Sequence, residues 1–358
     1  MADPEHTSPE SPARPRTRPW VSVARALRGF YRVLRANVLS FVGFVLVVAI
    51  VTVAIVVVLA PHLLVPYGAT QETGVYSGPP TLLRWPPSFA HPFGTDGASL
   101  DLYSEILLAL PLDLGIALAI AGFALLAGGS LGLIAGFFDR PGSVGGYTSA
   151  FILRTTDVFL AFPSLLLGLA IVAALGPGLW QVMVAVLLTW WPYYVRLVRG
   201  EVLAVKHLPY VTAARAAGVS ERRILLRHVL RNVLEPVVVY FTLDIGTVLV
   251  TFSTIAFVIP GVVSYPRPPE WGSMLSFFNL NYPISQYWWE VLFPSLAIFV
   301  TALAFSLLGD GLRDVLDPRT RRALVESVAA PNPPPEAPEL AGTAAANPSE
   351  GASMPEGS

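Results

Sequence analysis

The sequence predicts an all-α polytopic membrane protein with six transmembrane helices and both termini in the cytoplasm. Three observations lead to this prediction: 54% of the 358 residues are hydrophobic, 13% are charged, and the apolar residues occur in long runs. The charged fraction is about half that of a typical soluble domain. Long apolar runs with few charges are typical of helices that cross a bilayer.

Six apolar runs approach the roughly 20 residues that a helix needs to cross the hydrocarbon core. They cover residues 38–60, 111–137, 150–175, 178–198, 234–258 and 291–309. We interpret each run as one transmembrane helix. Glycine and polar residues in the second and third runs leave the ends of those two helices less sharply defined.

The basic residues predict the orientation of the helices. If the chain crosses the membrane six times, both termini lie on the same side. Of the 23 Lys and Arg residues, 21 lie on that side. Arg84 and Arg267 are the two exceptions, and they fall in the segments 62–110 and 259–290. Positive charge gathers on the cytoplasmic side of membrane proteins, so we expect both termini to be cytoplasmic.

Composition divides the chain into five parts. Residues 1–19 are polar and proline-rich, and we expect a disordered tail there. Residues 20–61 predict a helix on the lipid surface followed by the first membrane anchor, which is too long for a cleaved signal peptide. The other parts are an extracytoplasmic segment at 62–110, a core with five transmembrane helices at 111–319 and a disordered tail at 320–358.

One cytoplasmic loop has a pattern of its own. Residues 210–236 read YVTAARAAGVSERRILLRHVLRNVLEP and include five arginines. Pro209 is expected to kink or restart a helix, Gly218 to break it, and Ser220 to cap a second helix that begins at Glu221. The loop is therefore predicted to be a helix, a glycine turn and a helix.

The two helices of this loop differ in their surfaces. The first has small residues that let a partner approach closely. These residues are Ala213, Ala214, Ala216 and Ala217. The second has an apolar face opposite its arginines, made of Ile224, Leu225, Val229 and Val233. The pattern alone fits either a docking element for another protein or an amphipathic hairpin lying on the membrane.

The loop closely resembles the EAA loop of ABC importer permeases, the element that docks into a groove on the cytoplasmic ATPase. Other stretches extend the resemblance over about residues 30–319. They are RANVLSFVGFVLVV, APHLLVPYG, HPFGTD, RTTDVFLAFPSLLLGLAIVAALGPG, PEWGSML and FPSLAIFVTALAFSLLGDGLRDVLDPR. Together they resemble the second permease subunit of the dipeptide, oligopeptide and nickel branch. Thr212 stands where that family has a glutamate, and Arg231 where it usually has a proline.

The resemblance implies a multi-pass permease of the plasma or inner membrane and a set of partners. These are a second homologous permease subunit, two ABC ATPase subunits, an extracytoplasmic substrate-binding protein and membrane lipid, with no nucleic acid. The chain itself is expected to bind no cofactor, because its only lysine, Lys206, is not part of an ATP-binding P-loop sequence. The implied ATPase-coupling residues are Tyr210, Thr212, Ala213, Ala214, Ala217, Gly218, Ser220, Arg223 and His228.

Two acids are candidates for the translocation path. Asp244 lies inside the fifth run, where an unpaired charge is costly, so we expect it to face a polar path or a partner. Asp157 lies near the inner end of the third run, and Arg154 is spaced for a local ion pair with it. Asp113 lies near the outer surface, where we expect it to be hydrated.

An enzymatic alternative comes from the sequence GGSLG at 128–132. It matches the G-x-S-x-G nucleophile pattern and suggests an intramembrane serine hydrolase with Ser130 as nucleophile. All five histidines lie outside the apolar runs, so a general base is missing at that depth. We therefore predict no enzyme and interpret the glycines as helix-packing contacts. The absence of cysteine and of histidine–carboxylate clusters predicts no metal site.

The resemblance makes di- or oligopeptides the expected substrate. The same architecture in this branch also imports sugars, oligosaccharides or nickel, and the sequence does not choose among them. An ATP-independent channel is a further alternative of another class. The helix–glycine–helix loop argues against it, because a channel does not need an element that docks on an ATPase.

Overall fold

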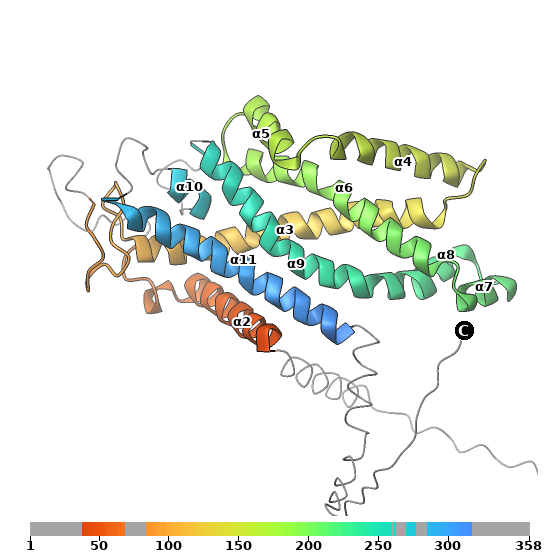
Figure 1. Cartoon of the computed structure of the whole chain (residues 1–358), viewed down its shortest axis with the longest axis horizontal. Helices are drawn as coiled ribbons and strands as arrows, with labels where there is room; N and C mark the ends of the chain where they lie inside the picture. The colour runs from red at the N-terminus through yellow and green to blue at the C-terminus, as the bar shows by residue number, and fades with distance from the viewer. Residues whose placement is uncertain (1–37, 69–83, 260, 263–269, 277–284, 317–358) are drawn as a thin grey trace, which may run out of the picture. The chain divides into compact units, whose positions relative to one another are not determined.

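The computed structural model describes residues 38–68, 84–259, 261–262, 270–276 and 285–316. Their secondary structure is α-helical, with short helical turns and one β-bridge between Thr95 and Asp101. The tails predicted at 1–19 and 320–358 lie outside the described residues, as does the predicted surface helix that begins at residue 20. Figure 1 shows long helices running alongside one another.

The first two long helices are α2 (Val38–Leu59) and α3 (Leu102–Phe137), with the short helical turn η1 (Pro61–Leu63) after α2. The helix predicted to start at residue 111 thus begins nine residues earlier. Asp101 explains this start, because its carboxylate accepts a hydrogen bond of 2.9 Å from the Ser104 backbone N–H and caps the first turn. At 1.5 Å per residue, the 36-residue α3 is about 54 Å long, well beyond the hydrocarbon core.

The prediction of one helix at 150–175 is wrong. The segment forms α4 (Val144–Leu160) and α5 (Ser164–Leu175), whose axes meet at 85°. Pro163 is the cause, because it has no backbone N–H to continue the helix and it disfavours the helical conformation in the residue before it. The chain therefore changes direction sharply between these two apolar helices.

The fourth and fifth predicted helices exist and are longer than predicted. The fourth is α6 (Leu179–Val205), and α7 (Pro209–Ala216) follows it. Three elements then form one helical segment over Glu221–Val258. They are α8 (Glu221–Arg223), the π-helical turn η3 (Ile224–Val229) and α9 (Leu230–Val258). After the short α10 (Trp271–Ser276), the last helix is α11 (Trp288–Leu316).

In the described part of the chain, four helical segments are long and apolar enough to cross a membrane, or five if the bent α4–α5 pair counts as one. The four are α2, α3, the segment Glu221–Val258 and α11. The helix α6 is not among them, because its polar and aromatic residues, such as Gln181 and Trp190, lower its mean hydropathy. The fold is that of a polytopic helical membrane protein.

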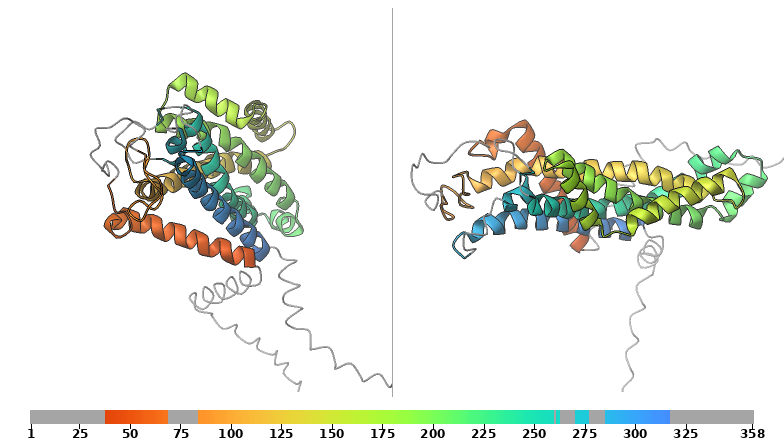
Figure 2. Two further views of the ribbon diagram at one scale, coloured as in Figure 1. Left: turned by 60° about the vertical axis from the view of Figure 1, so that its left-hand side comes forward. Right: turned by 90° about the horizontal axis from the view of Figure 1, so that it is seen from above.

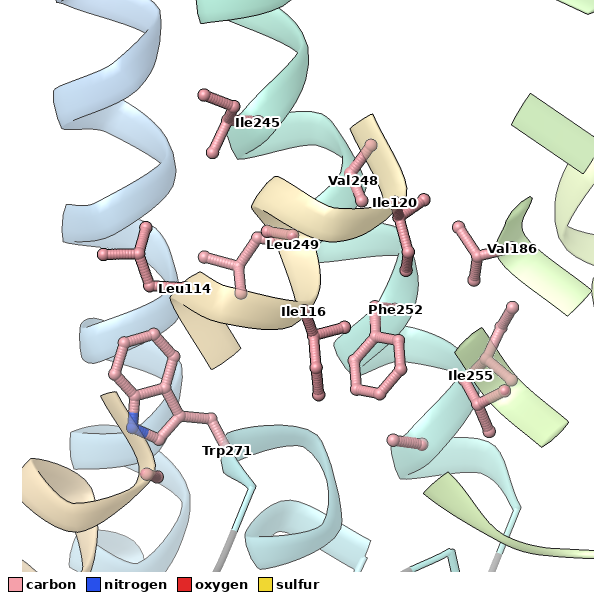
Figure 3. Packing of buried hydrophobic residues seen from close by; sticks show 14 of the residues in the cluster. Leu114, Ile116, Ile120, Val186, Ile245, Val248, Leu249, Phe252, Ile255 and Trp271 are labelled. Carbon is pink, nitrogen blue, oxygen red and sulfur yellow. The ribbon is translucent and has the colours of Figure 1, made fainter. Parts of the chain in front are cut away.

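The helices pack around α3 and α9. The most extensive contacts are those of α3 with α6, α9 with α11, and α2 with α11. Ile120, Phe252 and Ile255 are completely buried in the shared core. Figure 3 shows Ile116 and Ile120 of α3 beside Phe252 of α9, with side chains of α6 and α10 nearby.

Glycines bring α3 and α6 into close contact, as the sequence predicted for the GGSLG region. A methyl group on Gly128 would lie 2.3 Å from the Trp191 carbonyl oxygen, and one on Gly132 would lie 2.6 Å from the Val195 carbonyl oxygen. Gly136 would meet a side chain of α6 at 2.8 Å. Helices in lipid gain stability from this kind of close packing.

We predict that Gly128→Ala destabilises the protein by about 1–3 kcal/mol, because the new methyl group forces α3 away from the backbone of α6. The matched control is Gly122→Ala in the same helix, where no atom lies within 4 Å of the added methyl group. Thermal unfolding of both purified variants in detergent measures the difference. Equal melting temperatures for the two variants would show that the glycine contact does not hold the helices together.

Candidate functional site

The helix–glycine–helix loop lies where α6 leads into α9. Figures 1 and 2 show α7 and α8 at one end of the long helices, while α10 lies toward the other end. The connection from α6 to α7 turns at Lys206, and Pro209 occupies the first position of α7, where its missing N–H has no cost. The restart predicted at Pro209 is therefore confirmed.

Gly218 ends α7 in the way the sequence predicts. Its φ of +77° lies in the left-handed region that glycine adopts without strain. The Gly218 N–H bonds to the Arg215 carbonyl at 3.0 Å, and the Val219 N–H bonds to the Ala214 carbonyl at 3.1 Å. These two bonds form a Schellman cap, which fixes the turn between the two helices.

Ser220 occupies the capping position before α8, but the predicted bond from its side chain is absent. Its backbone is extended and its carbonyl accepts the N–H groups of Arg223 and Ile224 at 2.9 and 3.0 Å. The helix starts at Glu221, as predicted. The Ser220 side chain is exposed instead.

The apolar face of the second loop helix is covered by protein. Val211, Ile224 and Val229 are completely buried, and they pack with residues at the ends of α3 and α6 nearest the loop. Leu225 and Val233, the other members of the predicted face, are also buried. This packing contradicts the alternative of a hairpin that rests its apolar face on the membrane.

The outer surface of the loop remains exposed. Among the implied coupling residues, most side chains are exposed, and Ala214 and His228 are half-buried. The exposed ones are Tyr210, Thr212, Ala213, Ala217, Gly218, Ser220 and Arg223. They form a surface of small side chains next to an arginine, with space around Gly218.

Ion pairs that the sequence did not predict tie the loop to its surroundings. Glu221 binds Arg140, which follows α3, at 2.8 Å and Arg215 of α7 at 3.0 Å. Spacing along the chain could not reveal the Glu221–Arg140 pair, because the two residues are 81 positions apart. The loop is thus linked to the α3–α4 connection as well as to α6 and α9.

Two further contacts support the same region. Arg199 pairs with Asp139 at 2.9 Å, and the Lys206 ammonium donates a hydrogen bond of 2.9 Å to the Gly136 carbonyl. Burial lowers the pKa of Lys206. Both contacts join α6 and its end to the end of α3.

Asp244 lines a cavity and has hydrogen-bond partners within the chain. Its Oδ2 accepts hydrogen bonds from Trp190 Nε1 at 2.8 Å and from the Tyr194 hydroxyl at 2.9 Å. The cavity has a volume of about 450 Å³. The α9 residues that line it are Tyr240, Asp244, Thr247 and Thr251, which share one face of the helix. The other lining residues are Ser164, Trp190, Tyr193, Tyr194 and Leu197.

The second candidate path residue has a structural partner. Asp157 of α4 binds Arg196 of α6 at 2.7 Å, and both side chains are more than half exposed. The prediction that Asp157 pairs with Arg154 is therefore wrong. The tertiary contact between α4 and α6 supplies a different arginine, which spacing within one helix could not indicate.

Asp113 is also placed differently from the prediction. It is completely buried rather than hydrated, and its Oδ2 accepts the Trp271 backbone N–H at 3.1 Å. Its Oδ1 has no hydrogen-bond partner among the described residues. The neighbouring Glu270 is buried too and accepts the N–H groups of Gly272 and Ser273 at 2.7 and 2.8 Å. The Asp113 bond attaches α10 to α3, whereas the Glu270 bonds lie within the first turn of α10.

The described segment before α3 is held by polar contacts. His91 Nδ1 lies 2.9 Å from Asp101 Oδ1, so the HPFGTD stretch is joined to the start of α3. Arg84 binds Glu290 of α11 at 2.6 Å, with both side chains 6% exposed. These buried pairs connect the segment to two long helices.

Comparison with known proteins now gives the family. Residues 128–322, which include the loop and Asp244, match the family described as binding-protein-dependent transport system inner membrane component. The chain belongs to this family. It is therefore a permease subunit of an ABC importer of the peptide type, a multi-pass plasma-membrane protein and not an enzyme. Membership implies a complex with a binding protein and an ATPase.

Individual relatives are similar along most of the permease. A probable D,D-dipeptide transport system permease of Escherichia coli is 38% identical over 271 residues, covering 75% of this chain and 87% of that protein. A dipeptide transport system permease of Alkalihalophilus pseudofirmus is 34% identical over 320 residues, covering 88% and 99%. A glutathione transport system permease of Pectobacterium atrosepticum is 39% identical over 235 residues, covering 66% and 75%.

The position of Ser130 agrees with a permease and not with the serine hydrolase alternative. Its side chain lies on an exposed side of α3. The neighbouring glycines pack against α6 instead. The GGSLG sequence is thus part of a helix interface.

We predict that the permease loses stability as pH rises from about 4.5 to about 7 because of Glu270. Burial raises the pKa of Glu270 from 4.5 to about 7, so between these values the folded state keeps a proton that the unfolded state has released. The loss amounts to at most about 3 kcal/mol, since one pKa unit corresponds to about 1.4 kcal/mol.

Thermal unfolding of wild type and Glu270→Gln between pH 4.5 and 8 tests this prediction. The variant stays neutral throughout, so its melting temperature should fall less over that range. Parallel pH curves for the two proteins would show that Glu270 does not carry the effect.

Proposed function

We propose that this permease forms half of the translocation path of an importer for di- or oligopeptides. In this proposal, α2, α3, the bent α4–α5 pair, α6, Glu221–Val258 and α11 make six crossings, with both termini in the cytoplasm. The distribution of basic residues supports that orientation. The names of the relatives, which are dipeptide and glutathione permeases, support the substrate class.

The loop geometry carries the proposal for coupling. The loop has a buried apolar underside, a glycine turn and an exposed surface of small residues. We propose that this surface docks on an ATPase subunit, with Tyr210, Thr212, Gly218 and Arg223 at the contact. The complex would contain a second homologous permease, two ATPase subunits that use ATP, and an extracytoplasmic binding protein.

A rigid connection would transmit the motion of the ATPases. Glu221 begins a helical segment of 38 residues that reaches Val258, and Arg140 holds the beginning of this segment to the end of α3. When ATP binding closes the ATPase pair, the docked loop would move and the long helices would tilt with it. Hydrolysis would return them to the starting arrangement.

We expect the tagged permease, purified in mild detergent from its native membrane, to retain a second permease and ATPase subunits. Mass spectrometry identifies the retained proteins, and a labelled dipeptide then tests uptake after reconstitution with the binding protein. Reproducible recovery of the chain alone would favour the ATP-independent channel. Uptake of a sugar or of nickel in place of peptides would keep the docking proposal and change the substrate.

We predict that Gly218→Leu abolishes transport while ATP hydrolysis by the assembled complex continues. The added side chain would occupy the contact with the ATPase, and the position favours glycine because φ is +77°. Gly142→Leu is the matched control: Gly142 has φ +74°, and neither glycine has a neighbouring atom within 4 Å of an added methyl group.

Both variants therefore carry similar backbone strain in open surroundings. Transport and ATP hydrolysis in reconstituted vesicles should remain near wild type for Gly142→Leu. If Gly218→Leu transports as well as this control, the loop does not dock through Gly218.

A further inference from the structure

The cavity beside Asp244 has the chemistry of a site for a positive charge. Asp244 is the only charged residue that lines the described cavity, whose remaining walls are aromatic, hydroxyl and apolar side chains. Both hydrogen bonds to its carboxylate go to Oδ2, and no donor among the described residues reaches Oδ1. A carboxylate at membrane depth is costly without a partner, so a cation in the cavity would stabilise it.

Aromatic rings complete this site. The carboxylate is held in place by Trp190 and Tyr194, and Tyr193 lies with its ring centre 5.6 Å from that of Trp190. Tyr193 and Tyr240 are 46% and 55% exposed, so the cavity opens to the surface of the chain between them. Cations are attracted to the faces of such rings, and an ammonium group combines this attraction with a bond to a carboxylate.

The volume of the cavity and the polar groups that line it limit the kinds of ligand that it can bind. A volume of about 450 Å³ falls within the range of small-molecule sites and accommodates the end of a peptide. Divalent metal ions such as Ca²⁺ require six or more oxygen ligands, whereas one carboxylate and nearby hydroxyls suit an ammonium group. A neutral sugar has no charge that would pair with Asp244.

We propose that this cavity binds the N-terminal ammonium group of a peptide during transport. Asp244 Oδ1 accepts a hydrogen bond from the ammonium group, and the tyrosine rings at the opening surround the first residue. The proposal rests on the proposed peptide substrate and names the part of the peptide that the permease recognises. The same chemistry is offered by the ammonium group of a lysine side chain.

Equilibrium binding to the purified importer complex without its binding protein tests the proposal. The probes are three tritiated peptides: trialanine amide, N-acetyl-trialanine amide and N-acetyl-Ala-Lys-Ala amide. Omitting the binding protein removes its own selectivity from the measurement. We expect trialanine amide to bind about tenfold or more tightly than its acetylated form, the difference that a desolvated cation contact supplies.

Variants assign the effect to the cavity. Asp244→Asn should remove the preference for the free amine, and Asp244→Glu should restore part of it. Asp310→Asn is the control, because Asp310 is an exposed acid of α11 away from the lining residues. Retention of the preference in Asp244→Asn would overturn the proposal, as would equal binding of free and acetylated trialanine by wild type.

The lysine peptide separates the two sources of ammonium. Weak binding of N-acetyl-Ala-Lys-Ala amide supports recognition of the N-terminus, and binding equal to that of trialanine amide overturns it. The proposed function has a separate test. It is contradicted if wild type reconstituted with its binding protein takes up no peptide. Peptide uptake without dependence on the amine would overturn only the role of Asp244.

Discussion

Close contact between α3 and α6 determines where both candidate sites lie. Gly128, Gly132 and Gly136 remove the side chains that would separate the two helices, and the backbone of α6 fills the space. Apolar surfaces gain little from association in lipid, so tight packing of this kind must supply the stability. The contact fixes α6, which provides Trp190 and Tyr194 to the cavity and leads directly into the helix–glycine–helix loop.

The same helical segment joins the loop to the cavity. Glu221 and Asp244 belong to one continuous helical segment, and their separation of 23 positions corresponds to roughly 35 Å at 1.5 Å per residue. The π-helical turn over Ile224–Val229 lies near the loop end, and π-turns are frequent at functional sites. In the proposed mechanism, a displacement of the loop would therefore reach the cavity through the backbone of one segment, with α6 beside it.

Local patterns predicted the parts of the fold that depend on neighbours along the chain. Apolar runs located the helices, except that the run at 150–175 divides into α4 and α5. Pro209 and Gly218 located the loop turns, because proline and glycine act on their own backbone. Such patterns could not predict contacts between residues that are far apart in the sequence. The pairing of Asp157 with Arg196 and the burial of Asp113 against Trp271 join residues 39 and 158 positions apart. The polar face around Asp244 was visible in principle, since Tyr240, Thr247 and Thr251 follow helical spacing from it.

The two ends of the described helices differ in how their charges are held, and this difference suits the proposed movement of the loop. At the end away from the loop, Arg84 and Glu290 are each 6% exposed, and removing one partner of such a buried pair costs about 3–5 kcal/mol. At the loop end, the side chains of Arg140 and Glu221 are 59% and 35% exposed, and exposed pairs contribute about 0–1 kcal/mol. Water can replace the partner in an exposed pair, so the pairs of Glu221 would break and re-form if the loop shifts as proposed. The buried Arg84–Glu290 pair would keep its geometry and leave α11 joined to the segment before α3 during such a movement.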